Sequence, residues 1–213
     1  MIEFWFEFAS PYSYIAAMRI GQLCRDSKLK LRWWPFMLGP IFELQGWSTS
    51  HFNLNPLRGK YMWRDMERLT EKLALPWRHP TQFPRNCSLA ARVAAASAEA
   101  SWIERFVTST FIANFGDDRD LNNELVILDV LSTIVDDPEE TLRVALSEPA
   151  RSCLRKNTEQ AKAIGLFGAP NCVVGDELFW GEEALEDAIE WALRKSGELT
   201  VDQRMGVYSG PEL

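Results

Sequence analysis

Ser10-Pro11-Tyr12-Ser13 is the first segment whose residue types can do chemistry, and it follows an aromatic stretch at the start of the chain. Pro11 suits the first turn of a helix, and Ser10 suits its N-cap. The unpaired N–H groups and the dipole at a helix N-terminus stabilise negative charge and lower the pKa of a thiol held there. Because the chain supplies a hydroxyl here, we expect Ser10 to donate a hydrogen bond to a thiolate carried by another molecule. An ordinary helix cap is the alternative interpretation.

Two segments near the C-terminus have residue types that suit ligand binding. Pro170 precedes an expected strand, and a cis bond at Ala169–Pro170 would turn backbone groups outward to pair with an extended peptide. Glu182 and Glu183 begin an expected helix, where acidic side chains either complement the helix dipole or hold an ammonium group. The alternatives are an ordinary loop proline and a dipole complement.

Charge and cysteine usage exclude several function classes. The 213 residues include 23 basic and 30 acidic side chains, so the net charge is −7 and no basic surplus exists to neutralise phosphates. We therefore expect no nucleic-acid partner and no membrane partner. The four cysteines form no CxxC pair and only two histidines accompany them, so no metal site is expected. Without a signal peptide or a disulfide framework, the expected location is cytoplasmic.

The elements that must position these segments fall into three blocks. A strand over 2–8, a helix from Pro11 and a strand over 29–36 form a right-handed βαβ unit. Residues 37–56 are expected to form a long loop, and residues 57–165 to be mainly helical. Within the helical block, the local signals lie at 61–73, 87–115 and 120–135, and at the helix starts Pro138 and Pro149.

Strands return at the end of the chain. Residues 171–174 and 177–180 flank Gly175-Asp176, a hairpin signal, and a helix over 181–195 is stopped by Gly197. The predicted fold class is therefore α/β. A discontinuous domain, residues 1–40 and 165–198, encloses a loop plus helical insertion at 41–164, and a polar tail follows at 199–213.

In their order along the chain, these motifs resemble the 2-hydroxychromene-2-carboxylate isomerases and the related kappa-class glutathione transferases. Both belong to the DsbA-like branch of the thioredoxin superfamily. The resemblance extends to about residue 195 and implies a thioredoxin-like βαβ…ββα domain with a large all-helical insertion. The segments that carry it are Phe6-Glu7-Phe8-Ala9-Ser10-Pro11-Tyr12-Ser13-Tyr14, residues 59–68, residues 83–86, Phe167-Gly168-Ala169-Pro170 and Trp180-Gly181-Glu182-Glu183.

The resemblance implies glutathione as the cofactor and assigns it a set of residues. Ser10 would lie beside the glutathione sulfur, and the Ala169 backbone would pair with the cysteinyl part next to a cis Pro170. The remaining assignments are Glu182 and Glu183 to the γ-glutamyl end, Arg58 to the glycine carboxylate, Asn53 to glutathione or substrate, and Tyr12 and Phe83 to the substrate pocket.

The chain departs from the family pattern at three of these positions. Ala169 replaces the usual Val before the proline, and Arg58 replaces a commoner Lys. Glu183-Ala184 replaces the usual Asp-Arg pair, so the γ-glutamyl contacts are the least defined part of the predicted site.

The implied activity is isomerisation of conjugated aromatic carbonyl compounds, of the o-hydroxybenzylidenepyruvate type, in aromatic-compound catabolism. A thiolate would add reversibly to the double bond, and glutathione would return unchanged. A homodimer is also implied. The alternatives are a kappa-like transferase or peroxidase and a non-catalytic glutathione-binding module. The lack of CxxC at residues 10–13 argues against a thiol–disulfide oxidoreductase. Ser10 is not expected to be a covalent nucleophile, because neither His51 nor His79 has an Asp partner in the sequence.

Overall fold

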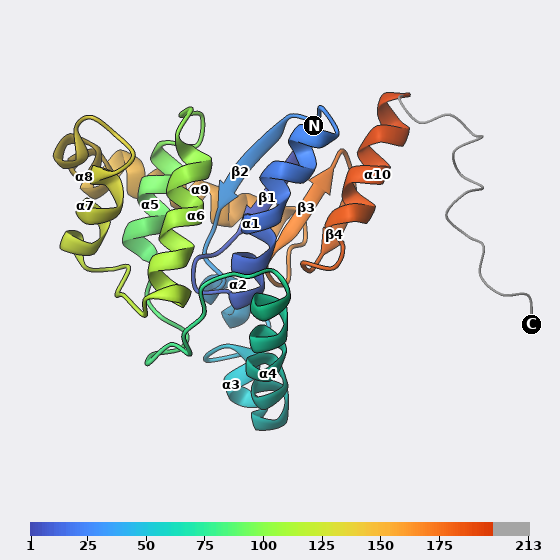
Figure 1. The fold of residues 1–213 in the computed structure, drawn as a ribbon, viewed down its shortest axis with the longest axis horizontal. Helices are drawn as coiled ribbons and strands as arrows, with labels where there is room; N and C mark the ends of the chain where they lie inside the picture. Colours follow the sequence, from blue (N-terminus) through green and yellow to red (C-terminus); the bar gives the residue numbers. More distant parts are fainter. Residues whose placement is uncertain (198–213) are drawn as a thin grey trace, which may run out of the picture.

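A four-stranded mixed sheet forms the centre of the computed structural model, which describes residues 1–197 (Figure 1). Its strands lie in the order β2-β1-β3-β4, and β1 pairs parallel with β2 and antiparallel with β3. Their bounds are β1 Ile2–Phe6, β2 Leu31–Pro35, β3 Asn171–Val174 and β4 Glu177–Trp180. The α/β fold predicted from the sequence is confirmed. The predicted tail from residue 199 lies outside the described residues.

The two faces of the sheet have separate cores because successive side chains of a strand point to opposite faces. Phe4 and Phe6 belong to the larger core, with residues of α1 (Pro11–Asp26) and α10 (Leu185–Ser196). Trp5 points the other way and packs with Phe36, Leu38 and residues of α9 (Glu148–Ala163). In Figure 1, α1 and α10 lie on one side of the sheet and α9 passes behind it.

Strand β1 is two residues shorter than predicted. The Phe36 N–H donates to the Phe6 carbonyl, and the chain then turns, with the Ser10 N–H donating to the Glu7 carbonyl at 3.0 Å. Aromatic and β-branched residues favoured a strand to Phe8. Residue composition alone, however, does not indicate that a turn begins within such a stretch. As a result, Glu7 lies in the turn between strand and helix and not in the sheet.

The predicted loop over 37–56 was wrong in part, because it contains two short helices. They are α2 (Gly39–Leu44) and α3 (His51–Leu54), and the long helix α4 (Pro56–Lys72) begins directly after them. The side chain of Ser50 accepts from the Phe52 N–H, and that of Asn55 accepts from the Arg58 N–H. Side-chain caps of this kind stabilise helices too short to show an apolar period. In Figure 1, α3 and α4 project from the end of the sheet to which β1 runs.

The remaining helices confirm the expected helical block. The alanine-rich stretch forms two helices, followed by a π-helical turn, and Asp137 caps a helix starting at Pro138, as predicted. The hairpin glycine Gly175 and the helix-ending Gly197 both have positive φ, of 64° and 77°. The bounds are α5 Ser88–Ala96, α6 Ile103–Phe111, η1 Ile112–Gly116, α7 Glu124–Ser132 and α8 Pro138–Leu146. Helix α10 begins four residues later than predicted.

The residue boundaries proposed for the discontinuous domain and its insertion stay a prediction. Within residues 1–197, no helix is both long and apolar enough to cross a bilayer.

Candidate active site

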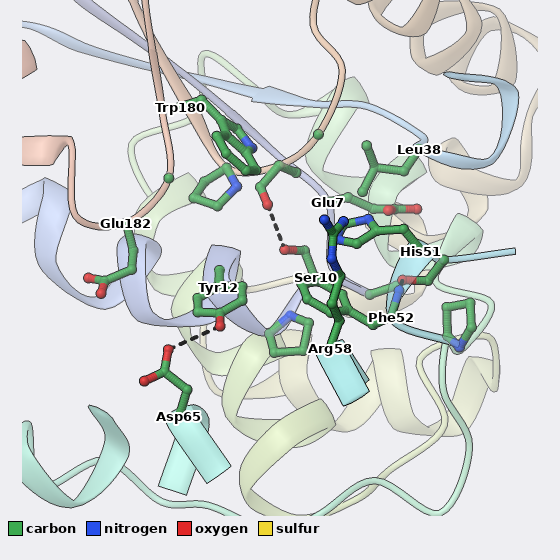
Figure 2. A pocket seen from close by; sticks show the side chains of 18 of the residues that line it. Glu7, Ser10, Tyr12, Leu38, His51, Phe52, Arg58, Asp65, Trp180 and Glu182 are labelled. Carbon is green, nitrogen blue, oxygen red and sulfur yellow. Dashed lines mark hydrogen bonds between the residues drawn. The ribbon is translucent and has the colours of Figure 1, made fainter. Parts of the chain in front are cut away.

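A cavity of about 600 Å³ lies where β1 joins α1 and β4 joins α10, with α2, α3 and α4 forming its other wall (Figure 2). This volume is typical of small-molecule sites. The cavity brings together residues that are up to 176 positions apart in the sequence, from Glu7 to Glu183. Eight of the nine predicted site residues line it: Ser10, Tyr12, Arg58, Phe83, Ala169, Pro170, Glu182 and Glu183.

Ser10 is buried at the floor of this cavity and caps α1, as predicted. Its Oγ accepts from the Ser13 N–H at 3.2 Å and donates to the Ala169 carbonyl at 3.0 Å (Figure 2). The hydroxyl therefore joins the two segments that the sequence analysis singled out separately. To donate a hydrogen bond to a thiolate, Ser10 must rotate its proton away from Ala169.

The Ala169–Pro170 peptide bond is cis, as the resemblance implied. The buried Asn171 amide donates to the Gly168 carbonyl at 2.7 Å, and the Gly181 N–H donates to the Pro170 carbonyl at 3.0 Å. These contacts fix the loop between α9 and β3 against the loop between β4 and α10. A Cβ at position 168 would lie 2.7 Å from the Trp180 indole nitrogen, so the close approach of these loops requires glycine there.

Glu182 and Glu183 both line the cavity, but their surroundings differ. Glu182 is 9% exposed, and its carboxylate accepts from Arg19 Nη1 at 2.7 Å. Burial raises the pKa of Glu182, and Arg19 opposes that effect. The Glu183 carboxylate packs against Gly181, whose φ of +103° and lack of a side chain allow this contact. Because Arg19 already neutralises Glu182, Glu183 is the better placed of the two to hold an ammonium group.

Arg58 and His51 form the wall on the α3–α4 side. Arg58, on α4, is oriented into the cavity in Figure 2. His51 stacks on Phe52 with ring centroids 4.0 Å apart, and burial together with the Arg58 charge lowers its pKa. The His51 Nδ1 atom is buried and has no hydrogen-bond partner among the described residues. His51 thus presents a neutral imidazole at neutral pH.

Tyr12 and Phe83 are at the cavity wall as predicted, but Asn53 is not. The Tyr12 hydroxyl donates to Asp65 at 3.0 Å, and burial followed by Asp65 raises the pKa of Tyr12. Asn53 instead donates to the Phe83 carbonyl at 3.1 Å and to Thr49 at 3.3 Å. Asn53 therefore supports the wall from behind, and its predicted contact with glutathione or substrate stays a prediction.

Glu7 is a site residue that the sequence analysis missed. Only 8% of Glu7 is exposed, yet it lines the cavity. Burial raises its pKa to about 7, although the Leu38 N–H donates a hydrogen bond to its carboxylate and lowers the pKa. The available signal was an acidic residue near the end of the mainly aromatic predicted strand, shortly before the Ser10 segment. His51, Phe52, Asp65 and Trp180 also line the cavity and were not predicted.

The cysteines lie away from the cavity. Cys24, Cys87 and Cys172 are buried, and burial raises the pKa of each of these thiols. Cys153 is partly buried beside α5, where its thiol contacts the Ala95 carbonyl. Within residues 1–197 no group of three or more His, Cys, Asp or Glu side chains is arranged to hold a metal ion. Any thiolate chemistry at Ser10 must therefore use a sulfur from a bound molecule.

Comparison with known proteins identifies similar chains over nearly the whole length. A 2-hydroxychromene-2-carboxylate isomerase from Sphingobium xenophagum is 27% identical over 187 residues, which are 87% of this chain and 94% of the relative. One from Pseudomonas putida is 24% identical over 205 residues, 94% of this chain and 99% of the relative. These identities are modest, but the alignments cover most of both chains.

Solved structures of similar fold cover nearly the whole chain. A 2-hydroxychromene-2-carboxylate isomerase structure superposes with a TM-score of 0.82 at 23% identity, covering 93% of this chain and 98% of that one. A probable DsbA oxidoreductase from Streptomyces coelicolor follows, with a TM-score of 0.72 at 18% identity over 93% and 91% of the two chains. The model of the DsbA-like thioredoxin domain matches residues 1–190. The chain therefore belongs to the DsbA-like thioredoxin domain family.

Proposed function

We propose that this protein is a glutathione-dependent isomerase of conjugated aromatic carbonyl compounds, of the 2-hydroxychromene-2-carboxylate and o-hydroxybenzylidenepyruvate type. The similarity to isomerases of that name over 87% or more of the chain supports the reaction class. The observation that carries the proposal is the position of Ser10. Its hydroxyl lies at the N-terminus of α1, on the floor of a 600 Å³ cavity, beside a cis-proline loop.

The residues present fit glutathione lying from the β4–α10 side of the cavity to Arg58 on α4. Ser10 and the start of α1 suit the sulfur, because a hydroxyl donor and the helix dipole both favour a thiolate. The backbone at Ala169 suits the cysteinyl unit, Glu183 the γ-glutamyl ammonium, and Arg58 the glycine carboxylate. When bound, glutathione supplies a thiolate that adds reversibly to the conjugated double bond and allows rotation about it.

The chain's own residues orient the substrate and exclude water. Phe42, Phe52 and Leu69 give the cavity apolar surface for a flat aromatic ring. Trp33 and Phe36, in contrast, are core residues and do not line the cavity. The cytoplasmic location and the homodimer implied by the resemblance stay predictions, and sedimentation analysis would test the dimer.

Calorimetric titration of glutathione into the wild type, Ser10→Ala and Ser13→Ala tests whether the cofactor binds. The absorbance of the bound thiolate, measured as a function of pH, gives the pKa of the bound thiol in each protein. Ser13 is the matched control, because its hydroxyl is buried on the same helix and has no hydrogen-bond partner within residues 1–197. We expect Ser10→Ala to raise the pKa of the bound thiol by about 1–2 units, since a hydrogen bond to a charged group contributes about 1.5–3 kcal/mol. Ser13→Ala should leave the pKa unchanged.

The outcomes separate the alternatives. No binding at millimolar glutathione would overturn the cofactor and the proposed function. Binding without isomerisation of o-hydroxybenzylidenepyruvate would indicate either a kappa-like transferase or peroxidase, if halides or peroxides react, or a non-catalytic binding module, if they do not.

A further inference from the structure

Two carboxylates are buried in the described part of the chain, and only one of them has a cationic partner. Glu182 is paired with Arg19 at 2.7 Å. Glu7 forms no ion pair within residues 1–197, and the one hydrogen bond to its carboxylate comes from the Leu38 N–H. A buried carboxylate without a cation is costly in its charged form and favours holding a proton.

The position of Glu7 gives that proton access to a ligand. Glu7 lines the cavity three residues before Ser10, because β1 ends at Phe6 and the chain turns there. In Figure 2, the Glu7 carboxyl lies on the side of Ser10 opposite to Glu182, toward Leu38 and the α3 wall. The proposed glutathione contact at Glu183 lies on the other side of the cavity, and of the proposed contacts Arg58 borders the Glu7 side.

The groups that surround Glu7 do not stabilise the negative charge of its carboxylate. Cys87, at the start of α5, is near enough for Glu7 to raise the pKa of its thiol, so Cys87 is neutral. His51 on α3 is neutral at neutral pH because burial and Arg58 lower its pKa. Arg58 on α4 lines the same wall but makes no ion pair with Glu7. With burial as the main cause, the pKa of Glu7 is raised to about 7, so the side chain can both give and take a proton near neutral pH.

We propose that Glu7 is a catalytic residue that donates a proton to the carbonyl oxygen of the conjugated substrate and later takes it back. This role rests on the proposed isomerase function. Glu7 therefore acts on the electrophile, whereas Ser10 acts on the sulfur.

The proton and electrons balance over the two steps. As the thiolate forms the C–S bond, the electron pair of the C=C bond shifts toward the carbonyl, and its oxygen takes the Glu7 proton. The former carbonyl oxygen is then an enol hydroxyl, the former double bond is a rotatable C–C single bond, and Glu7 is a carboxylate. In the return step Glu7 takes the proton back, the C=C bond forms again and the C–S bond breaks. The thiolate leaves unchanged.

The test compares the wild type with Glu7→Gln, using as the control Glu3→Gln, the same substitution on strand β1 and outside the cavity. With o-hydroxybenzylidenepyruvate and saturating glutathione, we expect Glu7→Gln to lower kcat about 100-fold or more, in the usual range for acid–base catalysis. The glutathione Kd should stay within about twofold of the wild-type value because Glu7 does not bind the cofactor. The wild-type kcat should fall as pH rises above about 7, as Glu7 loses its proton, and this limb should be absent from the residual activity of Glu7→Gln.

A second readout does not depend on turnover. The saturated ketone 4-phenyl-2-oxobutanoate has no double bond to react, so it should bind and shift the infrared C=O band of the protonated Glu7 carboxyl. That band should be missing in Glu7→Gln and present in Glu3→Gln. This measurement also applies to the wild type alone if Glu7→Gln does not fold.

Each outcome decides a different point. An inactive wild type would overturn the proposed function and the role of Glu7 with it. An active wild type with an equally active Glu7→Gln would overturn the role of Glu7 alone. A Glu7→Gln variant that loses thiolate formation on bound glutathione would show that Glu7 serves the cofactor thiol, which also overturns the proposal. So would an infrared band that the ketone leaves unshifted.

Discussion

The two sides of the cavity hold one buried carboxylate each, and the chain treats them in opposite ways. On the β4–α10 side, Glu182 is 9% exposed and paired with Arg19, which reaches it from α1. On the α2–α4 side, Glu7 is 8% exposed and receives only the Leu38 N–H. Two carboxylates with nearly equal solvent exposure therefore have different surroundings.

The difference teaches that the neighbouring cation, and not burial alone, determines what a buried carboxylate can do. Arg19 stabilises a fixed negative charge at Glu182, which helps to build the loop that carries Glu183. Glu7 has no such partner, so its proton is exchangeable near neutral pH. In the proposed function, Glu183 on one side would hold the ammonium end of glutathione, and Glu7 on the other side would move a proton.

The largest expected effect on stability comes from removing the charge of Glu7. The pKa of Glu7 is raised from 4.5 to about 7 in the folded protein, so the folded state holds this proton more tightly than the unfolded state. The wild type should therefore lose stability as pH rises from about 4.5 to about 7, by about 3 kcal/mol in total. Glu7→Gln cannot lose that proton and should be more stable than the wild type by this amount at pH 8, but not at pH 4.5.

Urea unfolding of both proteins at pH 4.5 and pH 8 measures the difference. Equal stability of wild type and Glu7→Gln at both pH values would mean that Glu7 is not desolvated, and the contrast with Glu182 would disappear.

A somewhat smaller effect is expected from breaking the partnered carboxylate. Arg19→Met should lower the free energy of unfolding by about 2 kcal/mol at pH 7, because it leaves Glu182 buried and charged without a partner. The loss should shrink at pH 4, where the unpaired Glu182 takes up a proton. Arg25→Met on the same helix is the control, since its ion pair with Glu104 is exposed and should contribute about 0.5 kcal/mol or less.

Chemical denaturation at the two pH values separates these variants. If Arg19→Met and Arg25→Met lower the free energy of unfolding by the same amount, Arg19 does not compensate a buried charge. Glu182 would then be a buried carboxylate without an effective cationic partner, as Glu7 is.

The smallest effect concerns the hydrogen bond that joins the two sides of the cavity. Tyr12 on α1 donates to Asp65 on α4 at 3.0 Å, so Tyr12→Phe should lower the free energy of unfolding by about 1 kcal/mol. Tyr61→Phe is the control, because Tyr61 is 62% exposed and its hydroxyl makes no hydrogen bond within the described residues. Thermal unfolding would show whether α4 is held by this contact; identical melting of the two variants would contradict it.

Local patterns in the sequence were enough to predict most elements and several site residues. The Ser10 cap, the hairpin at Gly175 and the helix end at Gly197 depend on residues that are neighbours in the chain. They can therefore be predicted without knowledge of the tertiary structure. The same is true of the helix start at Asp137. The short helices α2 and α3 escaped prediction, since each is too short to show an apolar period.

The sequence by itself determined the order of the strands and of the longer helices along the chain, the Ser10 segment at a helix start and the absence of a cysteine pair there. Only the tertiary structure decided that Ser10 bonds to Ala169, 159 residues later, and that Arg19 neutralises Glu182 and leaves Glu183 facing the cavity. It also decided that Glu7 is buried without a cation. The reason is that caps, turns and periodicity act between near neighbours, whereas desolvation and charge pairing depend on what distant segments place beside a group.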